Sequence, residues 1–476
     1  MTTAASQSEV RVLSTLNADG SRRWIKPWPS PGRFLRRRRV VAYALIGVFT
    51  VLPYLTINGK PPILLDIAAR EFTFFGVTFY PTDTLALALL IVSVFVAVFL
   101  VTALFGRIWC GWACPQTVYM EFLYRPIERL FEGRPGRKPK AGAWRKPAKH
   151  VAFLLVSMAL AHTFLAYFVG IDRLARWVTT PPTEHPVAFL VMAGVTGLMM
   201  FDFAFFREQT CLIACPYGRF QSAMLDRHSL IISYDRQRGE PRGKARRAAT
   251  DVSLPVTSRR GDCVDCGLCV RTCPTGIDIR DGLQMECIGC AQCIDACDAV
   301  MTKLGRPKGL IRYSSQAAME GARFTLLRPR VALYPLLLAV LIAALGVTIA
   351  RRPATLLTVA RATGGAAFYV EPDGSVVNRV RLTVRNQTSR PATYTARVAG
   401  LESARVTSAD LPLTLEPGEL AQATLAIQAP AGVFENGRRE VRIEVAPHTG
   451  EPVSKPIRLL GPWSAPGSVG GEEGHP

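Results

Sequence analysis

Eight of the twelve cysteines lie between residues 263 and 297, in two consecutive runs of the same spacing. Each run reads Cys-x-x-Cys-x-x-Cys-x-x-x-Cys, and Pro274 follows the first run where Asp298 follows the second. In bacterial ferredoxins, three closely spaced thiolates of such a run bind one 4Fe–4S cluster while the fourth binds its neighbour. We therefore expect one cluster on Cys263, Cys266, Cys269 and Cys297, and a second on Cys287, Cys290, Cys293 and Cys273.

Zinc is the alternative metal for these runs, because structural zinc sites also use Cys-x-x-Cys pairs. Two consecutive four-cysteine runs of this spacing favour clusters over zinc. Asp298 in place of a second proline leaves all four thiols of its run available, and affects only the local geometry or the potential. Two clusters in one small segment indicate electron transfer as the chemistry.

The other four cysteines form a second internal repeat, Cys-x-x-x-Cys-Pro, at residues 110–115 and 211–216. On a helix, an i, i+4 spacing places both sulfurs on one face, so two such faces predict a four-sulfur site. Soft thiolates prefer Cu(I). This predicts a copper or redox site at Cys110, Cys114, Cys211 and Cys215. A reversible dithiol–disulfide relay and four buried, inert thiols are the alternatives.

Five apolar runs approach or reach the roughly 20 residues that a helix needs to cross a bilayer. They are residues 40–57, 85–105, 151–169, 187–206 and 331–350. Hydrophobic residues make up 49% of the 476 residues, and the mean hydropathy is positive. The sequence therefore predicts an α-helical bundle of five transmembrane spans, with each Cys-x-x-x-Cys-Pro motif just after an even-numbered span.

Lys and Arg side chains gather in alternate loops, and the positive-inside rule uses this asymmetry to assign sides. Five arginines lie in residues 33–39 and ten Lys or Arg in residues 107–149, whereas residues 58–84 and 170–186 carry two each. We therefore expect residues 1–39, 106–150 and 207–330 on the cytoplasmic side of a bacterial inner membrane. Residues 58–84, 170–186 and the C-terminal domain are expected in the periplasm. The ferredoxin domain, at about residues 255–305, then lies in a reducing compartment.

The net charge of +21 would also be compatible with nucleic-acid binding, because Lys and Arg neutralise phosphates. The membrane topology explains the same charges, since cytoplasmic loops of membrane proteins retain Lys and Arg. The lipid bilayer is therefore an expected partner, and nucleic acid is not.

Two residues inside the apolar runs have ionisable side chains. His162 lies in the third run, where no second membrane histidine is available to complete a bis-histidine haem site. Asp202 lies in the fourth run, where an acidic residue is a functional candidate unless Arg207, about one turn away, neutralises it.

The C-terminal third has no cysteine and a different pattern. Short alternating segments, such as 380–384, 423–427 and 441–445, predict strands, and Pro-Asp-Gly and Pro-Gly sequences between such segments predict turns. A small β-sandwich over residues 353–462 fits this pattern best. The Gly-, Glu- and Pro-rich residues 463–476 are expected to be a disordered tail.

In this order, the duplicated Cys-x-x-x-Cys-Pro hairpins, the ferredoxin segment, the fifth span and the β-sandwich resemble the cytochrome c oxidase accessory proteins of the CcoG family, also called FixG or RdxA. The resemblance implies an immunoglobulin-like C-terminal domain and a role in assembling a cbb3-type oxidase. It implies reduction of Cu(II) to Cu(I), which copper chaperones then deliver. The clusters would supply the electrons, and Cys110, Cys114, Cys211 and Cys215 would be where copper meets them.

The same two motif types occur in other membrane proteins, which leaves two alternatives. The chain could be a quinol-linked polyferredoxin subunit similar to NapH, with no copper chemistry, or a copper-binding assembly scaffold whose clusters are structural. The electron donor is not identified by any motif in the sequence.

Overall fold

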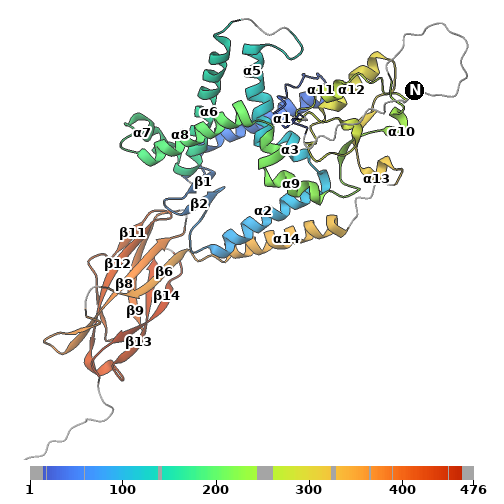
Figure 1. Ribbon diagram of the computed structural model, residues 1–476. Helices are drawn as coiled ribbons and strands as arrows, with labels where there is room; N and C mark the ends of the chain where they lie inside the picture. Colours follow the sequence, from blue (N-terminus) through green and yellow to red (C-terminus); the bar gives the residue numbers. More distant parts are fainter. Residues whose placement is uncertain are drawn as a thin grey trace, which may run out of the picture. The chain divides into compact units, whose positions relative to one another are not determined.

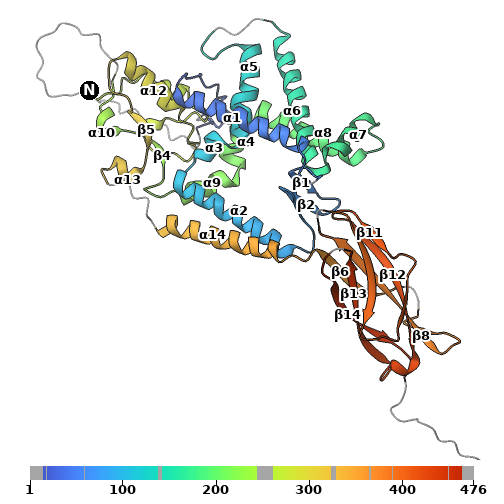
Figure 2. The same cartoon turned by 180° about the vertical axis from the view of Figure 1, so that it is seen from behind.

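The computed structural model describes residues 14–17, 19–57, 59–137, 142–243, 261–322, 329–363, 366–388, 390–448 and 450–463 (Figure 1; Figure 2). The chain separates into two compact units, Met1–Gly346 and Val347–Pro476. The predicted disordered tail lies outside the described residues from residue 464 onward, as does the start of the predicted ferredoxin domain up to residue 260.

In the part of the chain that the structure describes, four helices are long and apolar enough to cross a membrane. They are α2 (Thr84–Phe105), α6 (Arg145–Val169), α8 (Pro186–Phe201) with its π-helical continuation Asp202–Phe206, and α14 (Pro329–Ala350). Many of their large apolar side chains, such as Phe95 and Leu190, are exposed, as expected where lipid supplies the contacts. The second to fifth apolar runs therefore form the helices that the sequence predicts.

The first apolar run forms a shorter helix than a membrane span needs. Helix α1 (Arg33–Val51) begins with the basic residues 36–39 and continues as a 3-10 turn, Leu52–Tyr54, that contains Pro53. Its apolar part, residues 40–51, is about 18 Å long at 1.5 Å per residue, against the roughly 30 Å of a hydrocarbon core. Helix α1 is not among the four candidate spans, so the predicted fifth span is not confirmed.

A small three-stranded sheet, β1 (Ile63–Asp66), β2 (Glu71–Phe74) and β3 (Val77–Phe79), follows α1. Strand β1 contacts α6, and Asp66 Oδ2 accepts from Arg173 Nη1 of α7 (Ile171–Thr179) at 2.9 Å. The two loops that the charge pattern groups on one side of the membrane therefore meet in the structure.

Short helices follow the apolar helices α2 and α8. After α2 come α3 (Ile108–Trp112), α4 (Pro115–Tyr119), the π-helical turn Met120–Tyr124 and α5 (Arg125–Glu132). After α8 come the π-helical turn Thr210–Ala214 and α9 (Pro216–Met224). Pro115 and Pro216 are the first residues of α4 and α9. An N–H at this position would have no acceptor within the helix, so proline, which lacks one, is tolerated there.

The cysteine-rich segment folds between two paired strands. Strand β4 (Ile231–Tyr234) pairs antiparallel with β5 (Ile311–Ser314). Between them lie α10 (Arg236–Gly239), α11 (Leu268–Arg271), the 3-10 turn Ile279–Asp281 and α12 (Gln292–Lys303), and α13 (Gln316–Met319) follows. Cysteines pack here with apolar side chains such as Ile277, Ile294 and Leu310. The folded segment therefore extends beyond the predicted residues 255–305, because both strands lie outside them.

The second unit is an antiparallel β-sandwich, as predicted. One sheet has the order β10 (Arg405–Thr407), β12 (Leu420–Pro430), β8 (Ser375–Asn386) and β6 (Thr355–Arg361), with β7 (Tyr369–Val370) also paired to β8. The other has the order β11 (Leu413–Leu415), β9 (Ala392–Ala399), β13 (Arg438–Pro447) and β14 (Val453–Leu460). A 3-10 turn, Ala431–Val433, follows β12. Alternate residues such as Val380, Leu382 and Val384 fill the space between the sheets.

Candidate metal centres

The first four predicted cluster ligands line one cavity. Cys263, Cys266, Cys269 and Cys297 all border it, together with apolar side chains of β4, α12 and β5. Gly267 has a left-handed backbone, φ 65°, which turns the chain after Cys266 and starts α11 with Cys269 on its first turn. Helix α12 brings Cys297 from the second run, so this cavity collects three thiols of one run and the last thiol of the other.

The other four predicted ligands line a second cavity beside the first. Cys273, Cys287, Cys290 and Cys293 border it, and Cys269 is shared with the first. Ala291 repeats the role of Gly267 with a left-handed φ of 61° before α12. Within the described ranges, no three His, Cys, Asp or Glu side chains converge closely enough to hold a single metal ion. The thiols therefore surround two volumes and do not converge on one point.

Burial controls the ionisation of several of these thiols. It raises the pKa of Cys269 and of Cys297 to about 12 and that of Cys287 to about 11, while Cys266 is exposed. Thiols in this state are neutral near pH 7, so binding of a cationic iron centre would release their protons. Eight soft donors around two apolar cavities fit two 4Fe–4S clusters.

The two Cys-x-x-x-Cys-Pro motifs do not keep the helical geometry that their spacing predicts. Cys110 lies in α3, which ends at Trp112, and Cys114 has an extended backbone with ψ 127°. Cys211 lies in a π-helical turn, and Cys215 is extended with ψ 109°. The prediction that each pair shares one helix face is wrong, because the residue before a proline is disfavoured in the α conformation.

The four thiols are nevertheless brought together. Burial raises the pKa of Cys211 to about 12, and the charges of Cys114, Cys110 and Cys215 add to the rise. Burial likewise raises the pKa of Cys110 to about 11, although Arg107 opposes it. The Cys110 thiol also donates to Gln221 Oε1 at 3.1 Å. The four thiols thus lie near one another, and among them Cys110 and Cys211 are protonated near pH 7.

The first repeat packs directly on the second cavity. Cys110 belongs to a buried cluster with Ile288 and Cys290. Gly111 has no room for a side chain, since a Cβ would lie 2.6 Å from the Ile288 carbonyl oxygen and 2.8 Å from Cys290 Cα. A glycine between two cysteines was the signal for this contact in the sequence, but nothing local identifies its partner. The four-thiol cluster and the second cavity are therefore neighbours.

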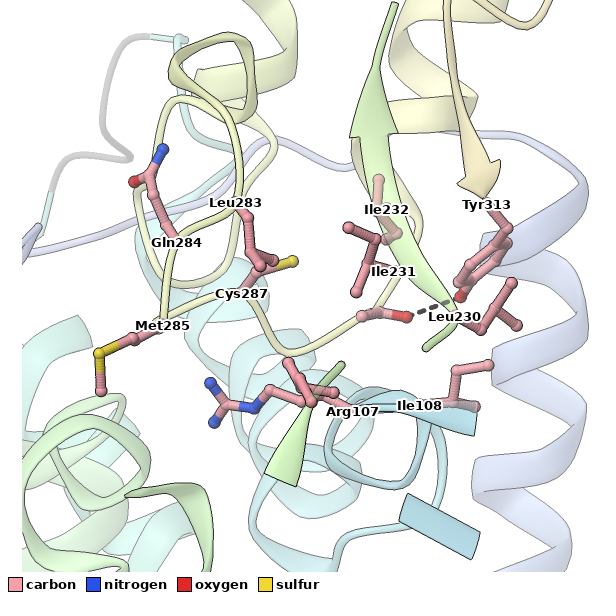
Figure 3. Close-up of a pocket in the computed structure, with 12 residues that line it drawn as sticks. Arg107, Ile108, Leu230, Ile231, Ile232, Leu283, Gln284, Met285, Cys287 and Tyr313 are labelled. Atoms are coloured by element: carbon pink, nitrogen blue, oxygen red, sulfur yellow. Dashed lines mark hydrogen bonds between the residues drawn. The ribbon is translucent and has the colours of Figure 1, made fainter. Parts of the chain in front are cut away.

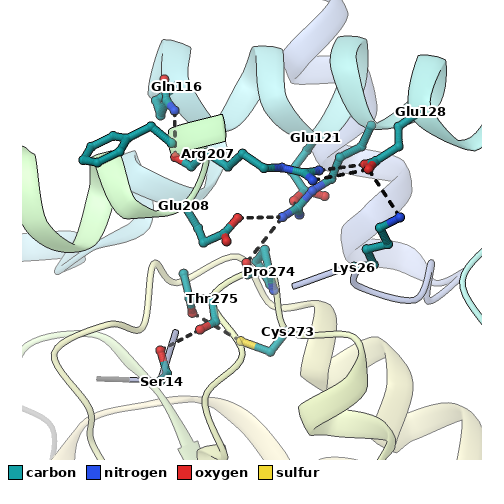
Figure 4. Close-up of polar contacts among 12 residues, drawn as sticks. Ser14, Lys26, Gln116, Glu121, Glu128, Arg207, Glu208, Cys273, Pro274 and Thr275 are labelled. Carbon is teal, nitrogen blue, oxygen red and sulfur yellow. Dashed lines mark hydrogen bonds and ion pairs between the residues drawn. The ribbon is translucent and has the colours of Figure 1, made fainter. Parts of the chain in front are cut away.

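A buried ion network joins both repeats to the ferredoxin loop (Figure 4). Arg125, 2% exposed, forms an ion pair with Glu121 and lies 3.8 Å from Glu208 Oε2. Its Nη2 also reaches the Pro274 carbonyl at 3.5 Å. Arg207 Nη2 pairs with Glu128 Oε2 at 2.7 Å. Charges from segments far apart in the sequence thus fix the position of residue 274, which follows the ligand candidate Cys273.

The two polar residues of the apolar helices have local partners. Asp202 accepts hydrogen bonds from Thr210 and, at 3.1 Å, from Gln116 Nε2. Arg207 does not neutralise Asp202 with its side chain, because its guanidinium pairs with Glu128. His162 Nδ1 lies 2.8 Å from the Met158 carbonyl within its own helix. Asp202 therefore links Thr210, next to the motif at residues 211–216, with Gln116, next to the motif at residues 110–115.

Three family models match consecutive parts of the chain. Residues 87–138 match a model described as a 4Fe-4S binding domain, and residues 206–316 match one described as a 4Fe-4S dicluster domain. Residues 345–462 match a model described as an IG-like fold at the C-terminal of FixG. The first of these matches contains Cys110 and Cys114, which places the first repeat inside a region similar to iron–sulfur proteins.

Whole-chain comparison finds several similar proteins. Protein RdxA of Cereibacter sphaeroides is 34% identical over 437 residues, which cover 86% of this chain and 90% of RdxA. Protein RdxB of the same organism is 34% identical over 407 residues, covering 81% of this chain and 82% of RdxB. Nitrogen fixation protein FixG of Rhizobium meliloti is 38% identical over 307 residues, and that match spans 62% of this chain and 57% of the length of FixG.

Proposed function

The chain belongs to the family of FixG and RdxA, membrane iron–sulfur electron-transfer proteins, and from this premise we propose that it reduces Cu(II) to Cu(I) for assembly of a cbb3-type cytochrome c oxidase. The observation that carries the proposal is the contact of the Cys110 thiol with Ile288 and Cys290. It sets a group of soft, buried thiols against the wall of a candidate cluster cavity.

The eight cysteines of residues 263–297 would hold two 4Fe–4S clusters, in the two sets that line the two cavities. When bound, the clusters supply the single electrons that reduction of each Cu(II) ion consumes. The apolar side chains around the cavities, among them Ile232, Leu310 and Ile311, exclude water from the buried thiols, whereas Cys266 stays exposed.

The four thiols of the repeats would bind copper. Thiolate sulfur is a soft ligand that prefers Cu(I) over Cu(II), so a thiolate site favours the reduced ion as product. Because burial keeps Cys110 and Cys211 protonated, with a raised pKa, copper binding would release protons. Gln221 and Arg107 hold Cys110 in place until that exchange occurs.

We also propose a bacterial inner-membrane location, with the thiols and clusters in the cytoplasm and the β-sandwich in the periplasm. The alternating Lys and Arg content of the loops supports this orientation. With residues 1–39 also in the cytoplasm, the orientation requires an odd number of spans, and therefore a fifth span over residues 40–57. A cytoplasmic copper chaperone would then receive the Cu(I).

The test is Cu(II) reduction by the purified, anaerobically isolated protein. Replacing Cys211 and Cys215 together by serine is expected to abolish reduction, while iron and sulfide contents stay unchanged. His162→Gln is the matched control in a membrane helix, and should reduce copper as the unaltered protein does. Full reduction by the double serine variant would remove these thiols from the mechanism.

A second function, quinol oxidation without copper chemistry, is favoured by one cavity (Figure 3). This cavity, of about 140 Å³, lies next to Cys287 and is lined by Arg107 and by apolar residues that include Leu230, Ile231 and Leu283. An apolar cavity of about 150 Å³ accommodates one aromatic ring, which is the size of a quinol head group. Reduction of the clusters by a soluble quinol, lost in a Leu230→Trp variant that fills the cavity, would support this function.

A further inference from the structure

Arg38 is a buried cation beside the second cavity. Its side chain is 0% exposed, and its Nε donates to the Gly111 carbonyl at 2.7 Å. Its two terminal nitrogens, Nη1 and Nη2, have no hydrogen-bond partner among the described residues. Its charge acts on Cys290 and Tyr313, and Cys290 is a candidate cluster ligand.

Arg107 is a second such cation, and it lines the neighbouring cavity that Cys287 also borders (Figure 3). It is 6% exposed, and its Nε and Nη1 have no hydrogen-bond partner within the ranges that the structure describes. Its charge acts on Cys287 of the second cavity and on Cys110 of the four-thiol cluster. Arg107 therefore stands between the two groups of thiols.

The carboxylate that acts on Arg38 is Asp295, and it is already engaged. Asp295 accepts from the backbone N–H groups of Phe34, at 3.2 Å, and Leu35, at 2.8 Å. These groups open helix α1, whose N-terminal partial positive charge offsets the carboxylate. Near Pro274, Arg125 pairs with Glu121 and Glu208, and Glu208 also pairs with Arg22, so these four groups are neutral as a unit. The second cavity is thus flanked by two cations and one compensated anion.

The first cavity has the opposite balance. Its cation, Arg280, lies between two carboxylates, Asp278 at 2.6 Å and Asp265. Asp298 adds a further negative charge, which acts on Cys297, and its own ion-pair partner, Arg33, is exposed and lies 3.9 Å away. Cys266 is exposed, so water reaches this end of the pair. The first cavity therefore has no surplus positive charge from the groups that face it.

A buried guanidinium with unpaired N–H groups is costly unless a negative charge lies beside it. A cluster held by four thiolates is anionic, and reduction adds one more negative charge. A nearby uncompensated cation in a low-dielectric interior stabilises the reduced form and raises the reduction potential. Burial alone would lower the reduction potential, because a low-dielectric interior disfavours the added negative charge. The cations therefore decide whether this potential is high.

We propose that Arg38 and Arg107 raise the reduction potential of the cluster on Cys273, Cys287, Cys290 and Cys293 above that of the cluster on the other four cysteines. This inference rests on the cluster ligands of the proposed function, but not on copper reduction. It makes the second cavity, which adjoins Cys110, the electron-accepting end of the pair. The exposed first cavity is then the end that meets an electron donor.

The test is an EPR-monitored redox titration of the full-length protein, with Arg38→Gln and Arg107→Gln as separate variants. Each variant should lower the reduction potential of the cluster in the second cavity by about 59 mV. For a one-electron couple, this shift is about a tenfold change in the reduction equilibrium. Arg38→Lys, which keeps the charge, should keep the reduction potential of this cluster close to that of the unaltered protein. Arg280→Gln is the matched control at the first cavity, and should leave the potential of the second cluster unchanged.

Single serine variants of Cys273 and Cys297 identify which signal belongs to which cavity. Normal iron and sulfide with unchanged potentials in both arginine variants would overturn the inference. If those variants fail to fold, the unaltered protein decides, because a higher potential for the Cys297 signal would also overturn it. Absence of iron and sulfide from the unaltered protein would instead defeat the ligand assignment of the proposed function.

Discussion

The ferredoxin thiols and the repeat thiols differ in what surrounds them. The eight thiols of residues 263–297 line two cavities, each with four or more sulfurs. The four repeat thiols approach one another, yet Cys110 already has the partners Gln221 and Arg107. The first group is arranged around the volume of a bound cofactor. In the second group, Cys110 and Cys211 are protonated, so a substrate ion would have to displace their protons.

The largest expected effect is the difference in iron content between a variant that lacks a ferredoxin thiol and one that lacks a repeat thiol. Cys290→Ala is expected to lower the iron content from about eight to about four atoms per chain, because one of two clusters loses a ligand. Cys114→Ala should leave the iron content unchanged. Iron and acid-labile sulfide analysis of both variants measures the difference.

The comparison fails if Cys114→Ala loses as much iron as Cys290→Ala does. The repeat thiols would then be cofactor ligands too, and the copper site would need other residues.

The next effect concerns the ion network that joins the two groups. Arg125→Met leaves Glu121 buried without its cation and Glu208 with Arg22 alone, which should lower the free energy of unfolding by about 3–5 kcal/mol. Chemical denaturation in detergent measures it. The exposed pair of Arg458 with Glu440, at 3.0 Å, supplies the control. Arg458→Met should change stability by less than about 1 kcal/mol. Equal losses in the two variants would show that the network does not support the fold.

A smaller effect should follow from separating the groups while keeping each intact. Gly111→Ala forces a Cβ to within 2.6 Å of the Ile288 carbonyl oxygen, so the first repeat must move away from Cys290. Copper reduction should fall by about tenfold with unchanged iron, since small displacements in a reacting pair are expensive.

Gly197→Ala is the control for this displacement, because no atom lies within 4 Å of a Cβ built there. An unaltered rate in Gly111→Ala, measured beside this control, would mean that close packing of the repeat on the second cavity is not needed for copper reduction.

The smallest effect lies within the ferredoxin segment. Ala291 has the left-handed backbone that Gly267 has at the equivalent place, and alanine is strained there. Ala291→Gly should therefore raise the free energy of unfolding by at most about 1 kcal/mol, whereas Gly267→Ala should lower it by a similar amount. Parallel denaturation curves of the two variants test the equivalence, and a loss of stability in Ala291→Gly would contradict it.

Spacing alone predicted which thiols line each cavity, because ligand runs of a ferredoxin are short and their geometry is local. The spacing groups Cys297 with the first ligand set and Cys273 with the second, and each lines a cavity with the other three thiols of its set. The β-sandwich also followed from local alternation, since Val380, Leu382 and Val384 face its core.

Long-range contacts could not be predicted in the same way. Arg38 sits in a basic run that indicates a cytoplasmic loop, but its side chain is fully buried against Gly111. No local pattern distinguishes it from its exposed neighbours. The extended backbones of Cys114 and Cys215 are local effects of the prolines that follow them, because the residue before a proline is disfavoured in the α conformation.

The most direct test of the account is the metal content of the protein isolated without oxygen. Iron and acid-labile sulfide analysis, combined with low-temperature EPR of the reduced sample, should give about eight iron atoms per chain and the signals of two 4Fe–4S clusters. Zinc in place of iron, with no acid-labile sulfide, would contradict the assignment of the eight cysteines and everything that depends on it.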